Sequence, residues 1–240
     1  VFAHVDDMHE VMRSIKYLLK DDGVFVFEVH YLLDLLETFQ YDMIYHEHKM
    51  HHSLMALSYL MNLFDMEIFD VERIPIHCGS IRVYTQNRYY ANKRKVMGSV
   101  GKLLNLEKDS GLDNEDTFIQ FGKEVYRKRD RILKMVKDLR LKGKRVVGYG
   151  ASGRSVIHLN FCNFGVEDVE YIVDASPERY GRLVPGTHNP IVAPEYFKKD
   201  NPDYAILFAY NYLEEIKEKE KDFLRNGGKF IVPLPEPKVV

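Results

Sequence analysis

The chain has 240 residues, an apolar fraction of 45% and a formal net charge of -2 at pH 7. This length and composition predict a globular protein with one large or two modest α/β domains. The small net charge predicts no binding to nucleic acid or to membranes, and we expect neither a bilayer-spanning segment nor a signal peptide. Two isolated cysteines, Cys78 and Cys162, indicate buried thiols in a reducing, cytoplasmic setting. The sequence leaves the oligomeric state open.

In the first part of the chain, predicted helices and strands alternate. Apolar residues at helical spacing predict an amphipathic helix over residues 7–20. The near-continuous apolar run at 24–29 predicts a strand buried on both faces, as in a parallel sheet. The further elements predicted here are a short helix at 32–39, a helix at 54–64 capped by Ser53, and strands at 67–74 and 80–86.

The middle of the chain, residues 89–142, is highly charged and is predicted to be a helical connector with a weak break near 109–113. Residues 1–88 are therefore predicted to form one domain. Residues 143–240 form a second, because strands and helices alternate there as in a small parallel α/β domain. Its helices include one predicted at 212–225.

A glycine-rich turn opens this second domain. Gly148, Gly150 and Gly153 follow a predicted strand, and Asp174 comes 21 positions after the last of them. This spacing is typical of a dinucleotide-binding turn with an acid placed to contact a ribose. The alternative is that the glycines only allow close packing of strand against helix, and the sequence leaves both interpretations open.

A stretch at residues 40–52 contains four of the ten histidines of the chain. Within it, Tyr45, Glu47 and His48 are suited to acid/base chemistry. An imidazole titrates near neutral pH, a carboxylate can orient it, and a tyrosine hydroxyl can donate to a developing oxyanion. These side chains predict an acid/base centre.

Two other interpretations of the histidine stretch remain. The zinc protease pattern His-Glu-x-x-His fails, because Met50 occupies the position of the second ligand after His46 and Glu47. His48 and His52 have the spacing of one helical turn, so a histidine metal site stays a minor alternative, although we predict no metal. The histidines could also be half-exposed loop residues without a role.

Several motifs occur in one order that is familiar from a single family. They lie at residues 45–48, 77–82, 148–151, 185–191 and 233–237. In this combination the chain resembles the S-adenosylmethionine-dependent sugar C-methyltransferases, which methylate C-3 of a nucleotide-linked 4-keto-deoxyhexose. The resemblance covers essentially the whole chain.

The resemblance implies a fold class and a domain order. We expect an α/β protein with the C-terminal part of a class I methyltransferase sheet, followed by a small Rossmann-like domain. Family members carry a cysteine-rich zinc module and a glycine loop for S-adenosyl-L-methionine ahead of these parts. Since this sequence has neither, we expect it to begin inside the methyltransferase domain, with zinc bound only in the missing region.

The resemblance also implies roles for the histidine stretch. His48 is expected to remove a proton from the carbon beside the ketone of a nucleotide sugar, while Tyr45 and Glu47 position it or stabilise the enolate. His4 follows what would be the fourth strand, where the family also has a histidine. We therefore expect His4 at the catalytic edge.

Further contacts are implied by the same family pattern. Phe2 and Ala3 are expected to contact the cofactor. His77, Gly79 and Arg82, in the turn between two strands, are expected to contact the substrate. From the second domain, the expected substrate contacts are Gly148, Gly150 and Asn211.

Two other functions stay open. A nicotinamide-dependent oxidoreductase would use Gly148, Gly150, Gly153 and Asp174. A non-catalytic nucleotide-sugar binding module would keep the second domain without the chemistry.

Overall fold

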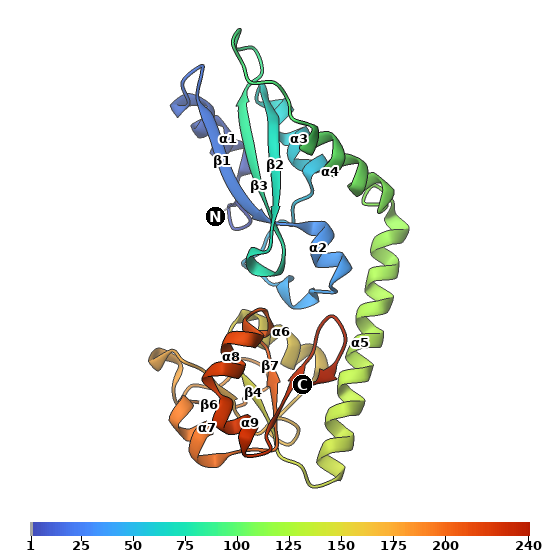
Figure 1. The fold of residues 1–240 in the computed structure, drawn as a ribbon, viewed down its shortest axis with the longest axis vertical. Coiled ribbons are helices and arrows are strands. Elements are labelled where there is room, and N and C mark those ends of the chain that lie inside the picture. Colours follow the sequence, from blue (N-terminus) through green and yellow to red (C-terminus); the bar gives the residue numbers. More distant parts are fainter. Residues whose placement is uncertain (1) are drawn as a thin grey trace. The chain divides into compact units, whose positions relative to one another are not determined.

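The computed structural model describes residues 2–240 and shows a mixed α/β protein with two compact units (Figure 1). The N-terminal unit comprises the residues up to Thr38 together with His46–Phe121. The C-terminal unit comprises Phe39–Tyr45 together with Gly122–Val240. These units are groups of packed residues, and the domains predicted at 1–88, 89–142 and 143–240 stay a prediction.

The N-terminal unit is built on a three-stranded sheet. Its strands are β1 (Val24–His30), β2 (Met66–Ile74) and β3 (Ser80–Asn87), in the order β1-β3-β2. The last strand lies in the middle and runs antiparallel to both neighbours. The arrangement agrees with the C-terminal part of a class I methyltransferase sheet, which we expected in this part of the chain.

The α-helices that lie wholly within this unit are α1 (Met8–Leu18), α2 (Leu32–Glu37), α3 (Leu54–Leu63) and α4 (Gly98–Asp109). The predicted cap of α3 is confirmed, since the Ser53 hydroxyl accepts a hydrogen bond from the Ala56 N–H at 3.1 Å. The fully buried Glu107 carboxylate on α4 accepts the Leu54 and Met55 N–H groups at 2.5 and 2.8 Å. Glu107 thereby satisfies donors that the first turn of a helix leaves without intrahelical partners.

The prediction of helix from residue 89 is wrong for residues 89–97, which are irregular, and α4 begins only at Gly98. The cause is a buried side chain at the end of β3. The Gln86 amide accepts the Arg94 N–H at 2.8 Å and donates to the Arg94 carbonyl at 2.7 Å. These bonds replace the helical pattern, because a side-chain amide competes for the same backbone groups.

The C-terminal unit contains a six-stranded sheet in the order β6-β5-β4-β7-β8-β9, parallel except for the last strand. Its strands are β4 (Val146–Tyr149), β5 (Ile172–Val173), β6 (Ile191–Val192), β7 (Tyr204–Leu207), β8 (Lys229–Val232) and β9 (Lys238–Val239). The chain builds outward from β4 in one direction and then returns to its other side with β7. This order is that of a Rossmann-like sheet, whose switch point lies between β4 and β7.

Helices cover both faces of this sheet. They are α5 (Glu115–Leu141), α6 (Gly153–Cys162), α7 (Pro194–Asp200), α8 (Leu213–Lys219) and α9 (Lys221–Arg225). The boundary between the two units falls within α5. The helix predicted at 212–225 is interrupted at Glu220, which is buried and accepts a hydrogen bond of 2.8 Å from the Tyr149 hydroxyl.

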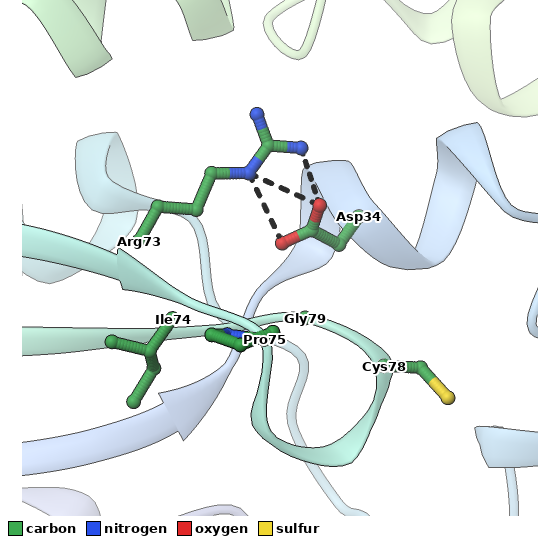
Figure 2. A pocket seen from close by; sticks show the side chains of 6 residues that line it. All are labelled: Asp34, Arg73, Ile74, Pro75, Cys78 and Gly79. Atoms are coloured by element: carbon green, nitrogen blue, oxygen red, sulfur yellow. Dashed lines mark hydrogen bonds and ion pairs between the residues drawn. The ribbon is translucent and has the colours of Figure 1, made fainter. Parts of the chain in front are cut away.

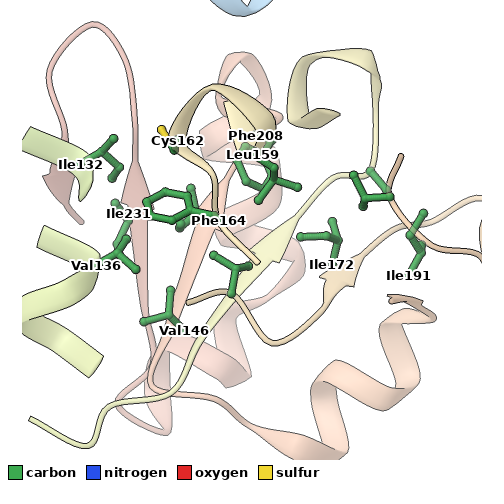
Figure 3. Packing of buried hydrophobic residues seen from close by; sticks show 14 residues of the cluster. Ile132, Val136, Val146, Leu159, Cys162, Phe164, Ile172, Ile191, Phe208 and Ile231 are labelled. Carbon is green, nitrogen blue, oxygen red and sulfur yellow. The ribbon is translucent and has the colours of Figure 1, made fainter. Parts of the chain in front are cut away.

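Alternating residues of the parallel strands fill two separate cores. On one face Val146, Ile172 and Ile231 pack with residues of α5 and α6, as Figure 3 shows. On the other face, Val147 and Ala205 pack in a cluster with side chains of α7, α8 and α9. Burial on both faces is the expected property of a parallel sheet. Within the described residues 2–240, no helix is both long and apolar enough to cross a membrane.

Candidate functional site

Two distant stretches of the N-terminal unit meet at the predicted acid/base centre. The Lys49 N–H donates to the Ala3 carbonyl at 2.9 Å, and the Lys49 ammonium pairs with the exposed Asp6 carboxylate. The rings of His4 and His48 lie edge to face with their centroids 5.1 Å apart. The structure therefore brings together two imidazoles that are 44 positions apart in the sequence.

Two further histidines lie deeper in the same cluster. The ring of His51 is 6.1 Å from that of His48, and partial burial, aided by the nearby His48, lowers the pKa of His51. His52 is only 6% exposed, and burial lowers its pKa to about 4. Both rings are therefore neutral at neutral pH, because desolvation disfavours the charged form of an imidazole.

The geometry does not support the metal alternative at His48 and His52. The stretch from His48 to His52 is not helical, so the spacing of four does not place the two rings on one helix face. Across residues 2–240, no group of three or more His, Cys, Asp or Glu side chains lies close enough to hold a metal ion.

The other members of the predicted centre differ in burial. Tyr45 is half-buried and belongs to the C-terminal unit, where its ring lies 3.5 Å from the place that a Cβ on Gly153 would occupy. Glu47 is exposed, and its carboxylate lies 4.0 Å from the exposed ring of His46. Tyr45 is therefore packed in place, whereas Glu47 is accessible to solvent.

The two predicted cofactor contacts also differ. The ring of Phe2 is buried and stacks on Phe27, with centroids 4.6 Å apart. Core packing accounts for this side chain. Ala3 is half-buried and stands beside His4, which is exposed.

The turn that links β2 to β3 has an unusual backbone. His77, Cys78 and Gly79 have φ values of 54°, 64° and 123°, in the region that favours glycine. A Cβ on Gly79 would lie less than 3.0 Å from the Asp34 side chain. Only glycine fits at this position, while His77 is exposed and its carbonyl lies 3.2 Å from Nε2 of His30.

A pocket of about 430 Å³ opens beside this turn (Figure 2). It is lined by Asp34, Arg73, Ile74, Pro75, Cys78 and Gly79. The Arg73 guanidinium reaches from β2 to the Asp34 carboxylate on α2, with Nε 3.1 Å from Oδ1, and also pairs with Glu37 at 2.9 Å. These carboxylates raise the pKa of Arg73, so a permanently charged group borders the pocket.

Arg82, which we expected to contact the substrate, lies in β3. Its guanidinium pairs across the sheet with Glu28 at 2.6 Å and with Glu72 at 3.3 Å. Cross-strand ion pairs account for this residue.

Other residues of the C-terminal unit pack closely against the glycines of its glycine turn. Gly148 is buried in β4, where a Cβ would lie less than 3.0 Å from Ile172 and Phe208. Gly150 has a φ of 97° and abuts Ala209. These two glycines are explained by packing and backbone conformation, and Asn211 is exposed in a turn after β7.

Asp174 does not present a free carboxylate to a ribose. One of its oxygens accepts the Ala151 N–H at 2.7 Å and pairs with Arg179 at 3.0 Å, and the other accepts the Ser176 N–H at 2.8 Å. The acid thus ties the glycine turn to the end of β5. This geometry supports the packing interpretation of the motif over the dinucleotide interpretation.

Sequence reasoning missed a group of paired side chains at this turn. Arg154, the residue after Gly153, forms an ion pair with Asp42 at 2.9 Å, and both contact Tyr210. An arginine directly after the glycine motif was the available signal. Its partner could not be identified, because it lies 112 positions away.

The fold and the site define a class: an α/β protein that joins the closing strands of a methyltransferase-type sheet to a Rossmann-like unit. A family model described as the C-methyltransferase C-terminal domain matches residues 75–235. The chain belongs to this C-methyltransferase family.

The chain is also similar to the C-methyltransferase NovU of Streptomyces niveus. The two are 38% identical over 239 residues, which cover 100% of this chain and 56% of that relative. The chain thus spans little more than half the length of the curated relative that it matches.

Proposed function

We propose that this protein acts in the S-adenosyl-L-methionine-dependent C-methylation of a nucleotide-linked 4-keto-deoxy sugar. The observation that carries the proposal is the pairing of His4 and His48, whose ring centroids are 5.1 Å apart in the N-terminal unit. The family supports C-methylation in general. The sugar substrate rests on the motifs at residues 45–48 and 77–82.

The proposed chemistry begins with loss of a proton from the carbon beside the ketone. His48 accepts this proton, and the electron pair of the broken C–H bond moves into an enolate with its charge on the ketone oxygen. The hydroxyl of Tyr45 donates to that oxygen. His4, beside His48, is placed to orient the base or to contact the substrate.

The residues at this edge fit a cofactor only in part. Ala3 and His4 are accessible and would contact it, whereas the ring of Phe2 is enclosed by the core. S-adenosyl-L-methionine, when bound, would supply an electrophilic methyl group to the nucleophilic carbon.

A methyl-transfer assay on the full-length protein tests the proposal. The reaction would use a labelled methyl donor and a panel of nucleotide-linked 4-keto sugars. Since removing a general base typically costs about 10²- to 10⁴-fold in rate, we expect that loss for His48→Gln.

The matched control is His46→Gln, which changes an exposed histidine two positions away. We expect this variant to keep the activity of the unchanged protein. Equal activity of His48→Gln and His46→Gln would remove His48 from the mechanism. No turnover by the unchanged protein on any such sugar, together with tight binding of the sugar, would favour a non-catalytic binding module.

A further inference from the structure

Residues Phe39–Tyr45 form a short segment directly before the remaining residues of the predicted acid/base centre. Although it lies between two stretches of the N-terminal unit, this segment belongs to the C-terminal unit by its contacts. It therefore packs on a part of the chain more than a hundred positions away.

The centre of these contacts is a buried ion pair. Asp42 is 2% exposed, and its two carboxylate oxygens accept hydrogen bonds from Nε and Nη2 of Arg154 at 2.9 and 3.2 Å. The Tyr210 hydroxyl donates to the same carboxylate at 3.1 Å, while the Arg154 guanidinium lies 4.2 Å from the Tyr210 ring centre. A bidentate arginine pair fixes the orientation as well as the position of a carboxylate.

Aromatic contacts hold the segment on either side of this pair. The Tyr41 hydroxyl lies 2.7 Å from Nδ1 of His158, and the two rings are stacked. Complete burial lowers the pKa of His158 to about 3, so Tyr41 faces a neutral imidazole. At one end Lys128 lies 4.1 Å from the ring centre of Phe39, and at the other end Tyr45 rests on Gly153.

These contacts lie at the carboxyl ends of the central strands of the C-terminal sheet. Arg154 is in the first turn of α6, directly after the glycine turn that follows β4, and Tyr210 follows β7. The carboxyl ends of β4 and β7 form the switch point, where folds of this type commonly bind nucleotides. Here, side chains of the protein's own segment Phe39–Tyr45 contact both sides of that point.

We propose that Asp42, Arg154 and Tyr210 form a lock that positions Tyr45 for the reaction, so that the Rossmann-like unit serves to hold a catalytic segment. This inference rests on the proposed function for the role of Tyr45. Asp42 is three residues before Tyr45, and consecutive Cα atoms are about 3.8 Å apart, so fixing Asp42 limits where the Tyr45 ring can lie. Glu47 and His48 follow within three further residues.

Hydrogen exchange in the full-length protein tests the lock without substrate. Arg154→Met removes the ion pair while keeping a side chain of similar length. We expect exchange in the peptide covering residues 39–45 to become at least about 10-fold faster, with exchange in β4 unchanged, because only the segment is released. Arg154→Lys keeps the charge but not the bidentate geometry. Its exchange rate in residues 39–45 should lie between those of the unchanged protein and Arg154→Met.

The matched control is Arg145→Met. Arg145 also pairs with two carboxylates in the C-terminal unit, those of Glu170 and Asp200, both at 2.7 Å. We expect this change to leave exchange in residues 39–45 as it is. If Arg154→Met fails to fold, Tyr210→Phe removes only the hydroxyl that donates to Asp42 and should raise exchange in the same peptide.

Kinetics then separate positioning from general stability. With a sugar that the unchanged protein methylates, Arg154→Met should lower kcat at least about 10-fold while KM changes less than about threefold, because chemistry rather than binding is affected. Unchanged exchange in both Arg154→Met and Tyr210→Phe would overturn the lock. Faster exchange with an unchanged kcat would overturn its role in catalysis. If the unchanged protein methylates no such sugar, the proposed function fails, and exchange alone decides on the lock.

Discussion

The two units each contain a cluster of ionisable side chains, but the clusters are built in opposite ways. In the N-terminal unit, His4 is exposed and His48 is half-buried, and their rings meet edge to face. In the C-terminal unit, Asp42 is almost fully buried and paired with Arg154. Accessible imidazoles can exchange protons with a substrate, whereas a buried and paired carboxylate holds a backbone in place. This contrast is the reason why we propose chemistry for the first cluster and positioning for the second.

Low pH should lower the free energy of unfolding through a buried histidine in each unit, and this is the largest effect that we expect. The folded-state pKa values of His52 and His158 are about 4 and about 3, against an ordinary value of 6.5. Between these values the unfolded chain binds protons that the folded chain does not. The contribution of these two histidines to the free energy of unfolding is therefore fully present above pH 6.5. It falls by about 1.4 kcal/mol per pH unit for each histidine as the pH drops toward 4.

Urea unfolding at several pH values measures this slope. His52→Gln and His158→Gln should each reduce the slope by about 1.4 kcal/mol per pH unit, because glutamine does not titrate. A slope that neither substitution changes would mean that other groups govern the acid sensitivity.

The second comparison is between two aspartate–arginine pairs. Asp42→Asn removes the buried carboxylate that pairs with Arg154, whose side chain is 13% exposed, and should lower the free energy of unfolding by about 3–5 kcal/mol. In the N-terminal unit Asp34→Asn leaves Arg73, which is 39% exposed and keeps Glu37, and should cost only about 1 kcal/mol. Denaturant titration of the two variants measures the difference, and equal losses would contradict the contrast in burial.

Glycine substitutions test the turn beside the pocket. Gly79→Ala places a Cβ against Asp34 at a φ of 123°, so we expect a loss of about 2–4 kcal/mol in the free energy of unfolding. The control is Gly122→Ala in α5, where the added Cβ meets nothing within 4 Å apart from the helix's own backbone and chain neighbours. That variant should gain up to about 1 kcal/mol, since alanine favours a helix. A neutral Gly79→Ala would show that the turn can adopt another backbone.

The smallest effect should come from the cross-strand pairs of β3. Because Arg82 and Glu28 have side chains 35% and 41% exposed, Arg82→Gln should change thermal stability by less than about 1 kcal/mol. A substrate role for Arg82 would instead appear as a raised KM in the methyl-transfer assay. Thermal unfolding and steady-state kinetics on one preparation separate these two results.

Local sequence patterns were sufficient where burial repeats along the chain. The position of β1 and the cap at Ser53 follow from neighbouring residues. The prediction that β1 is buried on both faces, as in a parallel sheet, is wrong, because β1 pairs antiparallel with β3 and its face with Val26 and Glu28 is exposed. Short elements were missed: β6 and β9 have two residues each, and their pairing depends on distant strands. The irregular stretch after β3 was missed because one buried amide, Gln86, determines it.

In the candidate site, too, local motifs predicted some features, whereas others depend on residues far apart in the sequence. Motifs along the chain pointed to His48 and His4, and the structure places their rings side by side. The lock depends on Tyr210, which is 168 positions from Asp42, so no local pattern could reveal it. Phe2 and Gly148 lie within motifs that indicated ligand contacts, yet packing accounts for both. A motif identifies a backbone path more reliably than it identifies which side chains face a ligand.

Solvent exchange at the carbon beside the ketone tests the central assignment most directly. The full-length protein is incubated in D₂O with a nucleotide-linked 4-keto sugar and without methyl donor, and NMR follows the loss of the C–H signal. The account predicts exchange with the unchanged protein and with His46→Gln, and a loss of at least about 100-fold with His48→Gln. Exchange that proceeds at full rate in His48→Gln would contradict it.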